Sequence, residues 1–179
     1  FGLALVEQLE RGGARPQALV LVPTRELAIQ VTEELRPLAA ARGLRIVAVY
    51  GGQPTGPQAR QAKEAHIVVA TPGRLQDLSD RRLVSLAAIR ILVLDEADRM
   101  LDMGFQPQVD RILRVVPNER QTMLFSATLD GAVAKLADAY THDAATVEAE
   151  LPAQAERGEI AHTFVPVTAD DKLERLVEQ

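Results

Sequence analysis

The sequence contains no cysteine and no tryptophan, and aromatic side chains make up only 3% of its 179 residues. The absence of cysteine excludes disulfides, thiolate zinc sites and a cysteine nucleophile, and it suits a reducing compartment. No apolar run approaches the roughly 20 residues needed to cross a bilayer, and the first residues show neither a basic segment nor a small-residue cleavage pattern. We therefore expect a soluble protein with no membrane partner and with the cytoplasm as its compartment.

The chain also lacks an excess of basic residues, since its formal net charge is -5. Domains that hold nucleic acid over a broad cationic surface carry a marked excess of Lys and Arg. The 20 basic residues are interleaved with 25 acidic ones, and no long block of one sign appears. Any nucleic-acid site must therefore be local, and most of these charges fit an ordinary solvated surface.

Short apolar runs alternate with stretches of helical periodicity. The runs do not alternate internally with polar residues, which is typical of strands buried on both faces; they cover 18–22, 44–49, 67–70, 91–94 and 122–125. Between the first two, Leu27, Val31 and Leu35 share one helical face. Strand alternating with helix predicts an α/β fold, a mostly parallel sheet with helices on both faces. Pro37 lies inside this helical pattern, and we expect a kink there rather than an early end.

The composition changes near residue 148. With 47% apolar residues, the chain can form one full-sized domain with a buried core, which we assign to residues 1–147; Thr146 and Val147 could still belong to a last strand. Residues 148–158 are small, polar and acidic and predict a linker. Residues 159–179 resume a strand pattern and then a helical one, and we assign them to the start of a second domain.

Five motifs directly follow the five apolar runs. They are Pro23–Ala28 (PTRELA), Gly51-Gly52 (GG), Thr71–Arg74 (TPGR), Asp95–Asp98 (DEAD) and Ser126–Thr128 (SAT). Ligands of an open parallel α/β sheet bind outside the carboxyl ends of its strands. The sequence therefore predicts that these five loops together form the functional site.

The run 91–94 ends directly in two carboxylates, Asp95 and Glu96. Phosphoryl transfer needs such a pair, because one carboxylate can hold Mg²⁺, commonly through water, and a neighbour can orient or deprotonate the attacking water. The alternative is that the acidic cluster merely caps the following helix, whose dipole favours negative charge there.

Two predicted helix starts carry arginine. Thr71 is a good N-cap followed by proline at the first helical position, and Thr24 with Arg25 has the same character. Free N–H groups and partial positive charge at such ends favour phosphate, so the two ends could hold a sugar-phosphate backbone without reading its sequence. Ordinary helix capping explains either motif taken alone.

The two remaining motifs are weaker signals. Gly51-Gly52 is by itself a plain turn, although it would also allow close approach of a ligand. The SAT motif can be a helix cap, or the hydroxyls of Ser126 and Thr128 can hydrogen-bond Asp98 and tie adjacent strand ends together.

The order and spacing of all five motifs resemble the first RecA-like domain of DEAD-box ATP-dependent RNA helicases, over roughly residues 3–147. The segment Leu101–Phe105 (LDMGF) is similar to that family's usual continuation. The resemblance implies a RecA-like P-loop NTPase fold. It also implies an enzyme that uses ATP and Mg²⁺ to unwind short RNA duplexes or remodel RNA–protein complexes, independently of RNA sequence and together with a second RecA-like domain.

The resemblance also implies roles for individual residues. Asp95 would act on Mg²⁺, commonly through water, and Glu96 on the hydrolytic water, so both would face the nucleotide. Asp98, Ser126 and Thr128 would couple hydrolysis to unwinding. RNA contacts are implied for Thr24, Arg25, Gly52, Thr71, Gly73 and Arg74.

Two parts of the family pattern are missing. The chain contains no GxxxxGK[ST] phosphate-binding loop and no adenine-reading glutamine segment; in the family both lie just upstream of a helix like residues 1–10. We therefore expect an N-terminally truncated piece of a longer enzyme, inactive as an isolated chain. A non-catalytic RNA clamp or scaffold is one alternative. A related DNA helicase is another alternative, and Asp98 and the complete PTRELA motif count against it.

Overall fold

The structure, a computed structural model, describes residues 1–13, 15–129, 131–148, 166 and 168. The chain divides into two units, Phe1–Ala144 and Ala145–Gln179. Nearly all of the predicted linker (148–158) and of the predicted second domain (159–179) lies outside the described residues. Thr146 and Val147 form no strand, and Val147 is 89% exposed, so the core domain gains no last strand there.

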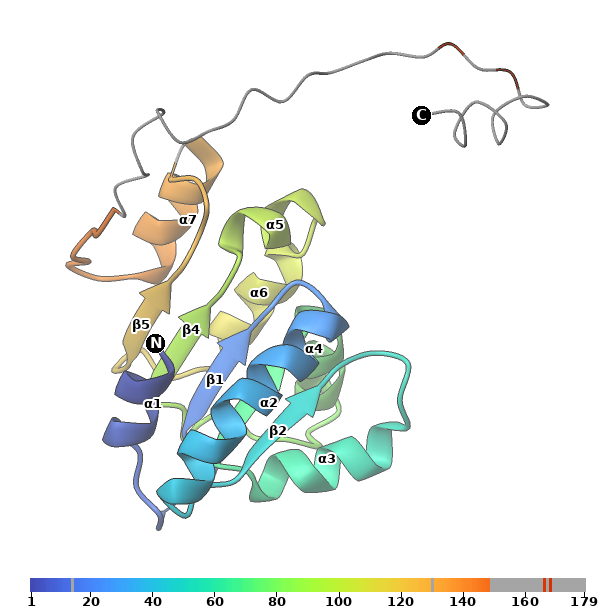
Figure 1. Ribbon diagram of the computed structural model, residues 1–179, viewed down its shortest axis with the longest axis vertical. Helices are drawn as coiled ribbons and strands as arrows, with labels where there is room; N and C mark the ends of the chain where they lie inside the picture. Colours follow the sequence, from blue (N-terminus) through green and yellow to red (C-terminus); the bar gives the residue numbers. More distant parts are fainter. Residues whose placement is uncertain (14, 130, 149–165, 167, 169–179) are drawn as a thin grey trace. The chain divides into compact units, whose positions relative to one another are not determined.

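Five parallel strands form one sheet in the first unit, as the alternation of strands and helices predicts (Figure 1). The strands are β1 Ala18–Leu21, β2 Ile46–Val49, β3 Ile67–Ala70, β4 Ile91–Leu94 and β5 Gln121–Leu124. Their order across the sheet is β2-β3-β1-β4-β5, and every neighbouring pair is parallel. All five carboxyl ends therefore lie at the same end of the sheet.

Seven helices accompany these strands in the described part of the first unit. They are α1 Gly2–Gln8, α2 Arg25–Ala41, α3 Thr55–Glu64, α4 Pro72–Asp80, α5 Ala97–Asp102, α6 Gln106–Leu113 and α7 Gly131–Tyr140. Helix α2 continues through Pro37, so the proline does not end it early. Pro37 lies on the exposed side of the helix, where water can reach the carbonyl that the missing N–H leaves free. No described helix has the length and apolar character of a membrane span.

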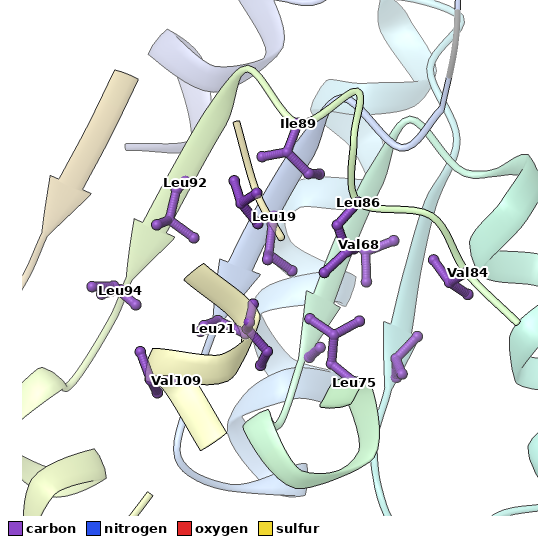
Figure 2. Packing of buried hydrophobic residues seen from close by; sticks show 14 of the residues in the cluster. Leu19, Leu21, Val68, Leu75, Val84, Leu86, Ile89, Leu92, Leu94 and Val109 are labelled. Carbon is purple, nitrogen blue, oxygen red and sulfur yellow. The ribbon is translucent and has the colours of Figure 1, made fainter. Parts of the chain in front are cut away.

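Successive residues of the central strands point into two separate hydrophobic cores. Leu19, Leu21, Leu92 and Leu94 pack with side chains from α3, α4, α5, α6 and α7. Figure 2 shows two of these partners, Leu75 of α4 and Val109 of α6. Val20, Val69 and Val93 pack on the opposite face against α1 and α2. The layers are therefore helix, sheet and helix, and the predicted α/β class is confirmed.

The β5 edge is less well covered than the middle of the sheet. All residues of β1, β3 and β4 are buried, whereas no residue of β5 is. Apolar side chains gather near this edge: the Phe1 and Phe125 rings lie 5.4 Å apart between centroids, and Phe125 and Leu129 are 40% and 42% exposed. Among the described residues, β5 pairs only with β4.

Candidate functional site

The five motifs all follow the carboxyl ends of strands, as predicted. Across the sheet their order is GG, TPGR, PTRELA, DEAD and SAT, because β2, β3, β1, β4 and β5 precede them. This spatial order differs from their order along the chain. The three loops expected to contact RNA are neighbours on one side, and the two loops expected to act in catalysis are neighbours on the other (Figure 1).

Asp95 begins the loop after β4 and is partly buried. Its backbone N–H donates to the Leu21 carbonyl at 3.0 Å, and its Oδ1 accepts from the Glu96 N–H at 3.1 Å. Burial raises the pKa of Asp95, and the nearby Glu96 charge acts in the same direction, whereas the Glu96 N–H lowers it. Asp95 forms no ion pair with a side chain among the described residues, and a partly buried carboxylate of this kind is a group that a bound cation would stabilise.

The site fits a Mg²⁺ ion that keeps most of its ligands from water and phosphate. No cluster of three or more His, Cys, Asp or Glu side chains suited to a metal occurs in the described part of the chain. Mg²⁺ is usually bound by only one or two carboxylates together with substrate phosphates and water. Asp95 can supply one such carboxylate, because its Oδ2 has no partner among the described residues.

Glu96 has an unusual backbone conformation. Its φ of 51° and ψ of 53° lie in the left-handed region, which costs a non-glycine residue roughly 1–2 kcal/mol. The next residue, Ala97, donates its N–H to the Phe125 carbonyl at 3.0 Å and so holds this turn against the loop after β5. The Glu96 carboxylate pairs with Arg99, with Oε2 at 3.1 Å from Nη1.

Asp98 joins the DEAD loop to the SAT loop, but not through the hydroxyls that the sequence suggested. Its Oδ2 accepts from the Ala127 N–H at 3.2 Å, and its Oδ1 accepts from the Arg99 N–H at 2.9 Å. Ser126 Oγ instead accepts from the Thr128 N–H at 3.4 Å, within its own loop. The predicted hydroxyl contacts with Asp98 are therefore absent, and the backbone N–H of Ala127, the residue between the two hydroxyl-bearing residues, contacts the carboxylate instead.

Thr24 caps α2 as predicted, since its Oγ1 accepts from the Leu27 N–H at 3.2 Å. Arg25 forms an exposed ion pair with Glu26. This pairing lowers the pKa of Glu26, chiefly through the hydrogen bond from Arg25. The Arg25 guanidinium therefore lies on the surface beside the start of α2.

Thr71 occupies the N-cap position of α4, but its side chain makes no capping hydrogen bond, contrary to the sequence prediction. Its own N–H donates to the Val49 carbonyl at 3.0 Å. Pro72 has no N–H, and the N–H groups of Gly73 and Arg74 have no partner among the described residues. Gly73 is exposed, so this helix end presents free donors to solvent.

Gly52 has a φ of +85° and is exposed, a conformation that glycine adopts without the steric cost of a side chain. The turn that contains it is linked to α4 by Arg74. The Nη1 of Arg74 donates to the Gln53 carbonyl at 2.9 Å and to Gln58 Oε1 at 2.8 Å. Sequence reasoning missed Gln58, because a single glutamine in a polar helix gives no signal.

A cavity of about 780 Å³ lies elsewhere, beside β2 and between α2 and α3. Its walls include Ile29, Arg36, Ile46 and Gln61. None of the predicted site residues lines it, but Gln53 and Gln58, the two acceptors of Arg74, do. The candidate functional site therefore stays at the open strand ends, and the cavity borders it near Arg74.

Comparisons with known proteins agree with this arrangement. A family profile described as DEAD/DEAH box helicase matches residues 1–136. The ATP-dependent RNA helicase DbpA of Escherichia coli is 49% identical over 150 residues, which cover 83% of this chain and 33% of the relative. The ATP-dependent RNA helicase CshA of Listeria monocytogenes is 46% identical over 143 residues, covering 79% of this chain and 28% of the relative.

A similar solved structure is the crystal structure of a DEAD box protein from the hyperthermophile Methanococcus jannaschii. It has a TM-score of 0.81 and 36% sequence identity, and the match covers 99% of this chain and 47% of that one. This likeness confirms the expected RecA-like helicase fold. The chain spans a third or less of the length of the two curated relatives above. Family profile, relatives and fold agree, and the chain belongs to the DEAD/DEAH box helicase family.

Proposed function

We propose that this chain is part of a cytoplasmic ATP-dependent RNA helicase that couples ATP hydrolysis to local duplex unwinding or to remodelling of RNA–protein complexes. The observation that carries the proposal is the order of the loops across the sheet. The carboxylates suited to phosphoryl transfer follow β4, and the helix ends suited to a phosphate backbone follow β1 and β3. Two ligands can therefore bind side by side at one end of the sheet.

Asp95 and Glu96 would act on the nucleotide. Asp95 would hold Mg²⁺, commonly through water, and the ion would supply positive charge to the phosphate oxygens of ATP. Glu96 would orient the attacking water and accept its proton. Because Glu96 is paired with Arg99 at 3.1 Å in the free chain, its carboxylate would exchange this exposed contact for the water, at a cost that is small for a surface ion pair.

RNA would lie across the loops after β2, β3 and β1. The proposed contacts are Thr24, Arg25, Gly52, Thr71, Gly73 and Arg74. Free N–H groups at Gly73 and Arg74 and the exposed turn at Gly52 favour phosphate over base edges. We therefore propose binding that is independent of base sequence and that prefers RNA over DNA through close approach to the 2′-hydroxyl.

Coupling would run through the contact between the DEAD and SAT loops. Asp98 accepts from the Ala127 N–H, and Ala97 donates to the Phe125 carbonyl. A shift of Glu96 on hydrolysis would therefore move the loop that contains Ser126 and Thr128. We keep these two hydroxyls as coupling residues whose partners come from elsewhere than Asp98.

The proposed domain organisation has three parts. Residues 1–147 form the RecA-like helicase domain, residues 148–158 a linker, and residues 159–179 the start of a second RecA-like domain. This second domain would be the main intramolecular partner, closing on the first when ATP and RNA are bound.

The proposal is tested by strand separation with the full-length protein. Release of a fluorescent strand is measured from a short RNA duplex and from a DNA duplex of the same sequence, with ATP or without it. ATP-dependent release from RNA alone supports the proposal. Release from DNA at an equal rate would favour the DNA helicase, and RNA binding without any release would favour the clamp or scaffold.

A further inference from the structure

Gln58 is a buried polar side chain in a helix whose other buried residues, Ala59 and Ala62, are small and apolar. It is 6% exposed. A buried amide is costly unless it is hydrogen-bonded. Gln58 Oε1 accepts from Arg74 Nη1 at 2.8 Å, so a charged donor from α4 offsets part of this cost.

The same Arg74 nitrogen also donates to the Gln53 carbonyl at 2.9 Å. Nη1 carries two N–H bonds, and these two acceptors use both. A guanidinium has five N–H bonds in one rigid plane, so fixing Nη1 fixes the direction of the remaining three. Those three, on Nε and Nη2, have no partner among the residues that the structure describes.

The three residues come from elements that meet at the strand ends. Gln53 follows Gly52 in the turn after β2, Gln58 lies in α3, and Arg74 lies in the first turn of α4. The fork of Nε and Nη2 has the geometry that binds a phosphate through two parallel hydrogen bonds. Orientation of this fork would therefore depend on Gln58, although Gln58 itself is buried.

We propose that Gln58 is a positioning residue for RNA binding, which holds Arg74 so that its free fork faces the phosphate backbone. This inference rests on the proposed RNA function of the same loops. Gln58 does not touch RNA; it acts through Arg74 and keeps the Gly52 turn beside the start of α4. Loss of the amide would leave Arg74 attached only to the Gln53 carbonyl and free to rotate.

The test uses the full-length protein and a labelled oligouridine, with affinity measured by fluorescence anisotropy over a range of salt concentrations. Gln58→Met keeps the side-chain volume and removes the acceptor. We expect RNA affinity on the order of tenfold weaker, equivalent to about 1.4 kcal/mol. The plot of log affinity against log salt concentration should become less steep and approach that of Arg74→Ala. Arg74→Ala loses one phosphate contact, which on a single strand lowers the slope by about 0.7.

Three further variants separate positioning from a general structural role. Gln58→Glu keeps an acceptor oxygen but adds a negative charge beside Arg74, so it is compared with Gln58→Met for RNA affinity alone, which it should recover in part. Gln61→Met, at an exposed glutamine of the same helix, should behave as wild type. In the Arg74→Ala background, Gln58→Met should cause no further loss of RNA affinity. If Gln58→Met does not fold, Gln58→Asn, which withdraws the amide by one methylene, gives the same test.

A wild-type salt slope in folded Gln58→Met, or full additivity with Arg74→Ala, would overturn the inference, because an uncharged residue changes the slope only through the arginine. Absence of RNA binding by the wild-type protein would instead remove the proposed function, and this inference with it.

Discussion

Gly73→Ala should stabilise the fold and weaken RNA binding at the same time. Gly73 is the second residue of α4 and has an ordinary negative φ, and a Cβ built on it meets no atom within 4 Å. Alanine is favoured over glycine in helices and restricts the unfolded chain, so the free energy of unfolding should rise by about 0.4–1 kcal/mol. For a domain of this size, the melting temperature should rise by roughly 1–4 °C.

The open space beside Gly73 is the reason for the opposite effect on RNA. If a phosphate binds the free N–H groups at Gly73 and Arg74, an added methyl lies in its path. Loss of one hydrogen bond to a charged group is worth about 1.5–3 kcal/mol, which corresponds to RNA binding weakened roughly 10- to 150-fold. The salt slope should stay nearly unchanged, because no charge is removed.

Gly56→Ala is the matched control. Gly56 is also the second residue of an exposed helix start, α3, and its Cβ would likewise meet nothing within 4 Å. It should bring a similar gain in stability with no change in RNA affinity. Thermal unfolding and fluorescence anisotropy on the same samples measure both quantities. RNA affinity equal to wild type in a folded Gly73→Ala would refute phosphate binding at this helix end.

Three further predictions concern the nucleotide side. Burial raises the pKa of Asp95, so its ionised form destabilises the free chain. The contribution of Asp95 to the free energy of unfolding is therefore highest at acid pH. It is lost as the pH rises from the ordinary aspartate pKa through the raised pKa. Asp95→Asn should therefore raise the melting temperature at neutral pH while weakening Mg²⁺-ATP binding; an unchanged pH dependence of unfolding would contradict this. Asp98→Ala removes the acceptor of the Ala127 N–H and should reduce RNA unwinding more than ATP hydrolysis, as should alanine at both Ser126 and Thr128, whereas equal losses would count against coupling. The chain Phe1–Gln179 alone, which contains no GxxxxGK[ST] loop, should show no ATPase activity, and RNA-stimulated turnover by it would show that the account of the site is wrong.

The strands were predictable because burial on both faces leaves a plain pattern. The run at 91–94 coincides with β4, and the run at 67–70 coincides with β3. Even the polar motifs could be placed at the strand ends, since parallel strands connected by helices all end on the same side. The fold class and the position of the five motifs at one end of the sheet therefore follow from local sequence.

The contacts within the site depend on tertiary arrangement, and the sequence could not specify them. Strand order brings the DEAD loop beside the SAT loop, and the donor that meets Asp98 is the backbone N–H of Ala127, which any residue except proline would supply. The left-handed conformation of Glu96 is likewise imposed by its surroundings. Gln58 gains its importance only because the fold brings its amide within hydrogen-bonding distance of Arg74, which lies in a different helix.

RNA-stimulated ATP hydrolysis by the full-length protein, wild type against Glu96→Gln, tests the central claim most directly. The substitution removes the carboxylate that orients water and leaves Asp95 in place. Turnover should require Mg²⁺ and RNA in the wild type and should nearly vanish in the variant, while binding of a fluorescent ATP analogue stays close to wild type. Near-normal turnover in Glu96→Gln would contradict the assignment of the strand ends as the ATPase site.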